Sequence, residues 1–197
     1  MVRRLSLAGP RRAPLATGLA VAALLVGGCA APGASTPKAA DPSGINTVGT
    51  TVFAVGSRPS LPALSGAALG GGTLDVASLR GHVVVLNVWA SWCEPCKEES
   101  PALAAVARST AAQGVRFVGI DENDEDAAAT AFLAKIGSSY PNLVDPQGRL
   151  LASLRMLPPA VPSSLVIDQQ GRVAARVIGP TTAAGMTALL AKVQSSS

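Results

Sequence analysis

The feature of this sequence that most constrains its fold is an apolar run that ends at two closely spaced cysteines. Residues 82–90 (HVVVLNVWA) are rich in β-branched side chains, as in a strand buried on both faces. The segment SWCEPC follows directly, and residues 94–113 have Ala, Leu and Glu at helical spacing before a stop at Gly114. The run therefore predicts a strand that leads straight into a helix, with Cys93 and Cys96 at the helix start.

The position of the two cysteines predicts redox chemistry. Cys93 faces the unpaired N–H groups and the positive dipole end of the predicted helix, which favour its reactive thiolate. We therefore expect Cys93 to be the exposed nucleophile, and Cys96, one turn inside the helix, to resolve the mixed disulfide. Pro95 suits the first helical turn because no N–H partner is needed there. The charge of Glu94 should oppose the thiolate somewhat.

The chain from residue 58 onward predicts one α/β domain. Its early part requires parallel strands joined by a helical crossover, and its later part contains a hairpin signal, QQG at residues 169–171. The prediction is a central mixed β-sheet with helices on both faces. The acidic run from Asp121 to Asp126 is expected to be a solvated loop and helix start. We expect strands at residues 115–121, 164–168 and 173–178, helices at 124–136, 148–156 and 181–193, and short extended pieces at 61–68 and 72–75.

The segment VVVLNVWASWCEPCKEE closely resembles the thioredoxin fold, and within it the extracytoplasmic TlpA/ResA-like (DsbE/CcmG-like) thiol–disulfide oxidoreductases. The resemblance covers roughly residues 58–195, and its most specific elements are WCEPC, Asn87, and Val161-Pro162. It implies a thioredoxin-like three-layer fold and an enzyme that exchanges disulfides with protein substrates without an organic cofactor.

The resemblance also implies roles for residues around the dithiol. Glu99 matches an acid associated with proton handling at the thiols, although without this match it reads as a solvated Glu. Asn87 stands where cytoplasmic thioredoxins carry a buried Asp, so it either supports the site or is a hydrogen-bonded core group. Pro162 matches the cis-proline that faces the dithiol, which would expose the Val161 backbone for pairing with a substrate segment. Trp92 is expected on the exposed rim around Cys93.

Other uses of a cysteine pair fit this sequence less well. A zinc site needs four ligands, and the single His of the chain is His82. A Sco-type copper chaperone would have three residues between its cysteines. A peroxiredoxin would carry Thr at the position of Ala90, so antioxidant activity is not expected. A purely structural disulfide would close too short a loop to stabilise much of the chain. We therefore predict a redox site with no metal.

The N-terminus carries the signals of export. Residues 1–12 contain four Arg and no acid, and the apolar run at residues 14–26 is too short for a membrane span. The sequence VGGC that follows resembles a bacterial lipobox, which implies removal of residues 1–28 and lipid on Cys29. Ordinary cleavage with a free Cys29 thiol is the alternative. Removing residues 1–28 leaves 12 basic against 12 acidic side chains, so the net charge of +4 gives no support to nucleic-acid binding.

The rest of the N-terminal region predicts a spacer before the catalytic domain. Residues 29–57 comprise the lipidated Cys29 and a stretch that is small and polar, with no helical or strand period. Such a tether would reach on the order of 30 Å from the membrane. The thioredoxin-like domain is then expected at residues 58–197.

Together these features predict a lipid-anchored, extracytoplasmic monomer that exchanges disulfides with protein cysteines. The resemblance suggests a reductant, with apocytochrome c as one candidate substrate and a membrane thiol carrier as the electron donor. The motif alone does not set the direction, because 30 mV in potential corresponds to only about 1.4 kcal/mol. A general disulfide-forming oxidase of secreted proteins and a metal- or haem-binding chaperone lipoprotein are the alternatives.

Overall fold

The computed structural model describes residues 49–196. The predicted signal peptide, Cys29 and most of the predicted tether lie outside the described residues. Within those residues no helix is long and apolar enough to cross a bilayer. The strands are β1 (Thr50–Val52), β2 (Ser65–Ala67), β3 (Thr73–Asp75), β4 (Val83–Trp89), β5 (Val115–Glu122), β6 (Asn142–Asp145), β7 (Ser163–Ile167) and β8 (Val173–Ile178). The helices are α1 (Glu94–Thr110), α2 (Asp126–Ile136), α3 (Arg149–Leu154) and α4 (Ala183–Gln194), with 3-10 turns η1 (Val55–Ser57), η2 (Val76–Leu79) and η3 (Ala111–Gln113).

The central sheet is mixed, as predicted. Its strand order is β1-β8-β7-β4-β5-β6, and β2 pairs separately with β3. β4, β5 and β6 are parallel, with α1 and α2 as their crossovers. β7 pairs antiparallel with β4, and β8 and β1 continue the antiparallel part. The carboxyl end of β4 therefore lies beside the start of β7, and this end of the sheet carries both Cys93 and Pro162.

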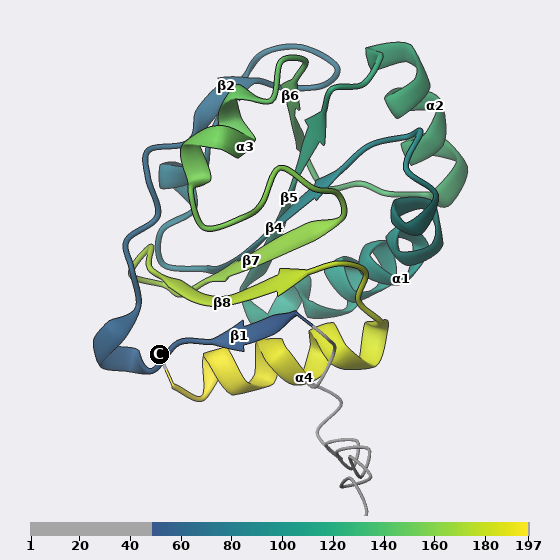
Figure 1. Ribbon diagram of the computed structural model, residues 1–197. Coiled ribbons are helices and arrows are strands. Elements are labelled where there is room, and N and C mark those ends of the chain that lie inside the picture. Colours follow the sequence, from purple (N-terminus) through teal and green to yellow (C-terminus); the bar gives the residue numbers. More distant parts are fainter. Residues whose placement is uncertain (1–48, 197) are drawn as a thin grey trace, which may run out of the picture. The chain divides into compact units, whose positions relative to one another are not determined.

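Strand β4 shows why the sheet needs helices on both faces. All seven of its residues are buried, and successive side chains of a strand point to opposite faces. Val83 and Val85 pack in one apolar core with α1 and α4, whereas Val84 and Leu86 pack in a second core with α3. Figure 1 shows α1 and α4 together on one side of the sheet and α3 on the other. The three-layer thioredoxin-like prediction is confirmed.

The folded domain begins earlier than the sequence predicted. The sequence predicts that residues 50–57 belong to the tether, yet Thr50–Val52 pairs with β8 as an edge strand, and η1 follows. The boundary at residue 57 is therefore wrong. A three-residue strand is too short to show a period, and its partner lies far along the chain, so no local signal marks it. The same reason explains why β6, four residues long, was not predicted.

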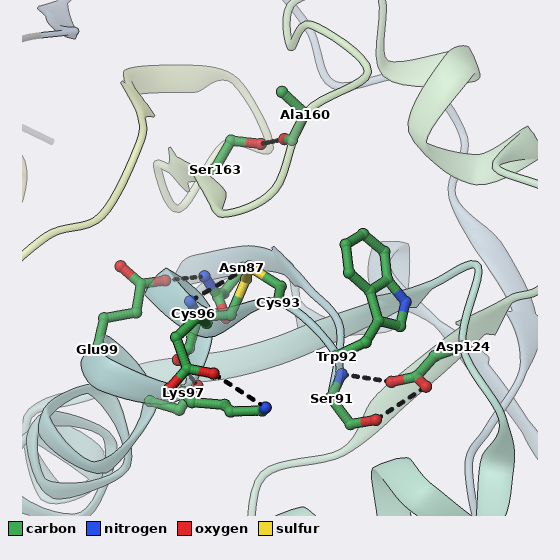
Figure 2. Close-up of a disulfide and its surroundings, with 12 residues drawn as sticks. Asn87, Ser91, Trp92, Cys93, Cys96, Lys97, Glu99, Asp124, Ala160 and Ser163 are labelled. Carbon is green, nitrogen blue, oxygen red and sulfur yellow. Dashed lines mark hydrogen bonds and ion pairs between the residues drawn. A yellow bond between two sulfur atoms is a disulfide. The ribbon is translucent and has the colours of Figure 1, made fainter.

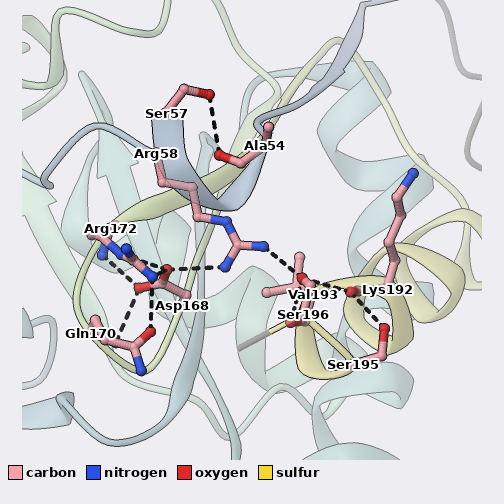
Figure 3. Close-up of polar contacts among 10 residues, drawn as sticks. All are labelled: Ala54, Ser57, Arg58, Asp168, Gln170, Arg172, Lys192, Val193, Ser195 and Ser196. Carbon is pink, nitrogen blue, oxygen red and sulfur yellow. Dashed lines mark hydrogen bonds and ion pairs between the residues drawn. The ribbon is translucent and has the colours of Figure 1, made fainter.

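A buried ion pair fastens the start of the domain to its end (Figure 3). Arg58 Nη1 lies 3.0 Å from Asp168 Oδ2, with both side chains almost fully buried, and Arg58 Nη2 donates to Ser196 Oγ at 2.6 Å. Burial acts to raise the pKa of Asp168, but hydrogen bonds from Arg172 and Arg58 outweigh it and lower that pKa. Asp168 follows β7 beside the start of β4, so this pair lies at the opposite end of the sheet from Cys93.

Candidate active site

The two cysteines form a disulfide at the start of α1. Cys93 is the N-cap residue of α1, and the Cα atoms of Cys93 and Cys96 are 5.2 Å apart. The Cys96 backbone N–H donates to Cys93 Sγ at 3.2 Å, which is the contact expected of a sulfur at a helix N-terminus. Cys93 is 5% exposed and Cys96 is fully buried. Cys93 is thus slightly more accessible than Cys96, but the prediction that it is exposed does not hold for the disulfide form, because apolar side chains surround it.

An apolar cluster surrounds the disulfide. Trp89, Ala90 and Ala129 are its buried members besides the cysteines, and Val161 packs against them from the loop before β7. The Val161–Pro162 peptide bond is cis, as the resemblance implied. The Pro162 carbonyl accepts a hydrogen bond from the Gly179 backbone at 3.0 Å. The structure thus brings Val161 and Pro162 to the dithiol from a segment far along the chain.

Glu99 is a buried carboxyl on the inner face of α1. It is 4% exposed, and it accepts hydrogen bonds from Asn87 Nδ2 at 3.0 Å and from the Thr181 backbone N–H at 2.7 Å. Burial raises the pKa of Glu99 to about 7, although these two hydrogen bonds act to lower it. Asn87 is fully buried and also donates to Ser164 Oγ at 3.2 Å. Figure 2 shows Asn87 between Glu99 and the disulfide. A carboxyl in this state can gain or lose a proton near neutral pH.

Two residues at the rim of the site lie largely in solvent. Trp92 is 54% exposed, as predicted, and its Nε1 donates to the Asn123 carbonyl at 2.9 Å. The Glu94 carboxylate pairs with Lys97 Nζ at 3.1 Å, and its side chain is 74% exposed. Solvent and this cation both weaken the influence of the Glu94 charge on Cys93. Pro95 occupies the first turn of α1, as predicted.

The acidic run from Asp121 to Asp126 contains the exposed loop and the helix start that the sequence predicted, but its first residue is buried. Asp121 is 2% exposed, because it lies on β5 directly opposite Trp89 in β4. Asp124 accepts hydrogen bonds from the backbone N–H and the Oγ of Ser91, just before Trp92. No sequence period marked either residue as part of the site. The only available signal was that both β4 and β5 end at the same edge of a parallel sheet. Across residues 49–196, no three His, Cys, Asp or Glu side chains are grouped as metal ligands.

Comparison with known proteins agrees with this geometry. A family model described as the AhpC/TSA family matches residues 59–176. The chain belongs to the AhpC/TSA family. It is similar to the thiol-disulfide oxidoreductase ResA of Bacillus thuringiensis, with 28% identity over 125 residues, 64% of this chain and 71% of that protein. It is also similar to the thiol:disulfide interchange protein HelX of Rhodobacter capsulatus, with 36% identity over 108 residues, 54% of this chain and 58% of that protein.

Solved structures of similar proteins share this fold. The described domain matches a DsbF homologue from Corynebacterium diphtheriae with a TM-score of 0.70 and 28% identity, covering 75% of this chain and 94% of that one. The prediction of a thiol–disulfide oxidoreductase on a thioredoxin-like fold is confirmed by these relatives together with the Cys93–Cys96 pair.

Proposed function

We propose that this protein reduces disulfides of other proteins outside the cytoplasm. The observation that carries the proposal is the Cys93–Cys96 pair at the start of α1, with a buried, protonatable Glu99 three residues further along the helix. In the reduced enzyme the Cys93 thiolate attacks a substrate disulfide and displaces one substrate thiolate, forming a mixed disulfide. The Cys96 thiolate then attacks Cys93 Sγ, releasing the second substrate thiolate and leaving the enzyme disulfide. An external dithiol carries out the reverse exchange and restores the enzyme.

Glu99 is proposed to manage the proton of Cys96. The resolving thiol must lose its proton before it can attack, and buried thiols cannot release it directly to water. A carboxyl with a pKa of about 7 can accept that proton at neutral pH and pass it on. The hydrogen bonds from Asn87 and Thr181 hold both oxygens of Glu99 in place, so Asn87 acts through Glu99 as a positioning residue.

Val161, Pro162 and Trp92 are proposed to contact the substrate chain. Val161 packs against the disulfide cluster but lies outside β7, and among residues 49–196 its backbone belongs to no strand pairing. A substrate segment can therefore pair with this backbone as an added strand. The exposed indole of Trp92 offers an apolar surface on the other side of Cys93.

The direction of exchange is the part of the proposal that needs a direct test. We expect rapid alkylation of thiols in living cells to find Cys93 and Cys96 mostly as a dithiol, kept reduced by a membrane thiol carrier. A predominantly oxidised pair would instead indicate a general oxidase of secreted proteins.

Apocytochrome c is the proposed substrate. A strain lacking the protein should then accumulate apocytochrome with its haem-binding cysteines oxidised, and normal cytochrome c levels would contradict this substrate.

Cys29 is proposed to anchor the protein by a lipid after removal of residues 1–28. The support is the VGGC sequence after a short apolar run. Labelled palmitate should be incorporated into the wild-type protein and not into Cys29→Ser, which should also leave the membrane fraction. Equal labelling of both proteins would contradict lipidation at this residue. Redox activity of the released variant in solution should be unchanged, because residue 29 precedes the described domain.

A further inference from the structure

Polar contacts that do not involve the cysteines join the loop after β4 to the loop after β5 (Figure 2). Ser91 donates from its backbone N–H and its Oγ to the Asp124 carboxylate, the second of these at 2.9 Å. Trp92 Nε1 donates to the Asn123 carbonyl at 2.9 Å. We call these four residues the loop clamp. Because Trp92 immediately precedes Cys93, the loop clamp fixes the position of the exposed indole beside the disulfide.

Asp121 is a buried carboxyl next to the loop clamp that the dithiol chemistry does not use. It is 2% exposed, and among residues 49–196 its Oδ1 atom has no hydrogen-bond partner. An ionised carboxylate in this position would be costly, because burial without a donor or a cation is strongly unfavourable. The charged groups that act on it are all acidic, namely Asp124 in the clamp, Asp126 on α2 and Glu122 on its own strand.

The same surroundings favour the protonated form of Asp121. Burial is the largest effect, followed by the charge of Asp124 and a hydrogen bond to Asp124, and together with the more distant acids these raise the pKa of Asp121 to about 8. At neutral pH Asp121 therefore carries a proton and can donate it in a hydrogen bond, while the Asp124 carboxylate also accepts from Ser91.

We propose that Asp121 is a positioning residue for the exposed rim of the active site. In its protonated form it donates a hydrogen bond to Asp124, and this keeps the Asp124 carboxylate on Ser91 and holds Trp92 beside Cys93. When Asp121 loses its proton, its buried carboxylate faces the partly buried carboxylate of Asp124, and no cation of residues 49–196 is among the groups that act on Asp121. Their repulsion moves Asp124 away from Ser91 and releases the loop clamp. The consequence for substrate exchange rests on the proposed function, in which Trp92 contacts the substrate. The release of the loop clamp on deprotonation of Asp121 does not depend on it.

The test follows the fluorescence of Trp92 in the oxidised, purified full chain between pH 6 and pH 10. The disulfide keeps both thiols out of the titration, and the Trp92→Phe variant supplies the background from buried Trp89. The measurement is made in the Glu99→Gln background, so that Glu99 does not titrate. We expect a transition with a midpoint near pH 8, and we expect Asp121→Asn to abolish it, because an amide donates to Asp124 at every pH. Emission in this variant should stay at the low-pH value of the parent.

Two further variants make the outcome specific. Asp126→Asn removes one exposed acid from the same neighbourhood and should retain the transition, displaced to slightly lower pH. Asp124→Ala removes the acceptor of Ser91 and should give the high-pH emission at every pH. The absence of a transition in the parent, or the same transition in Asp121→Asn, would overturn the proposal.

A kinetic measurement then separates this proposal from the proposed function. The rate of protein-disulfide reduction by the wild type should fall about tenfold above pH 8 relative to Asp121→Asn, which corresponds to loss of one good hydrogen bond. The rate with a small disulfide that does not reach Trp92 should be equal in the two proteins. A fluorescence transition without this difference in rate would support the role of Asp121 in the loop clamp. It would refute only the proposed contact of Trp92 with the substrate.

Discussion

Replacing Cys93 with serine is expected to reduce protein-disulfide reduction to the uncatalysed rate. Every step of the exchange passes through the Cys93 sulfur, and a hydroxyl at this position is neither a sufficient nucleophile nor able to form the mixed disulfide. The measurement is the turbidity that develops as insulin is reduced by dithiothreitol. A Cys93→Ser variant that still accelerates this reaction would refute the dithiol mechanism.

Cys96→Ser is the matched variant for that experiment. It retains the attacking sulfur but lacks the resolving one, so it should accumulate a stable mixed disulfide with the substrate, visible as a covalent adduct on non-reducing gels. Both variants lose the disulfide, whose short loop contributes about 2 kcal/mol by chain-entropy arguments. Reduced wild-type protein is therefore the correct reference for their stability. Adducts formed by Cys93→Ser would mean that the roles of the two cysteines are reversed.

Glu99→Gln is expected to remove a strong pH dependence of stability from the oxidised protein. The folded state holds a proton on Glu99 up to a pH of about 7, because its pKa is raised from 4.5, whereas the unfolded chain loses it near pH 4.5. The stabilisation that Glu99 gives to the folded state is therefore fully present below pH 4.5, and it is lost as the pH rises to about 7. The loss amounts to about 3 kcal/mol in the free energy of unfolding.

Chemical denaturation at pH 4.5, 6 and 7.5 would measure this effect. Glu98→Gln is the matched control, because Glu98 is the exposed neighbour of Glu99 on α1 and its removal should leave the pH dependence unchanged. Asp121 adds a slope of the same sign in all three proteins, so only the difference between variants reports on Glu99. A Glu99→Gln protein whose stability falls with pH as steeply as the wild type would show that Glu99 does not carry the proton.

The strand, the two cysteines and the start of α1 could be predicted from the sequence because their signals are local. An apolar run, a helix-start motif and a proline in the first turn all lie within residues 82–96. The approach of the Val161–Pro162 segment to the disulfide cluster was expected only from a family resemblance, since nothing in the local sequence connects this segment with Cys93.

The burial of two carboxyl groups could not be predicted from local sequence signals. Glu98 and Glu99 are adjacent in the sequence, yet one is exposed and the other buried, because only Glu99 faces Asn87 and the Thr181 backbone. The acidic run after β5 predicted a solvated loop from its composition alone. Asp121 is buried instead because it still belongs to β5, which continues two residues beyond its last apolar residue, Ile120, and aligns Asp121 with Trp89. Both outcomes depend on partners brought together by the parallel sheet.

The pairing of β1 with β8 also sets where the polypeptide leaves the domain. Gly49 accepts a hydrogen bond from the Ile178 backbone, and Ile178 lies opposite Ser163, next to Pro162. The outermost strand thus begins at the reactive pole of the molecule, three strand spacings, or about 14 Å, from β4. The tether proposed to follow Cys29 would therefore join the domain at the end of the sheet that carries the dithiol, and not at the end that carries the Arg58–Asp168 pair.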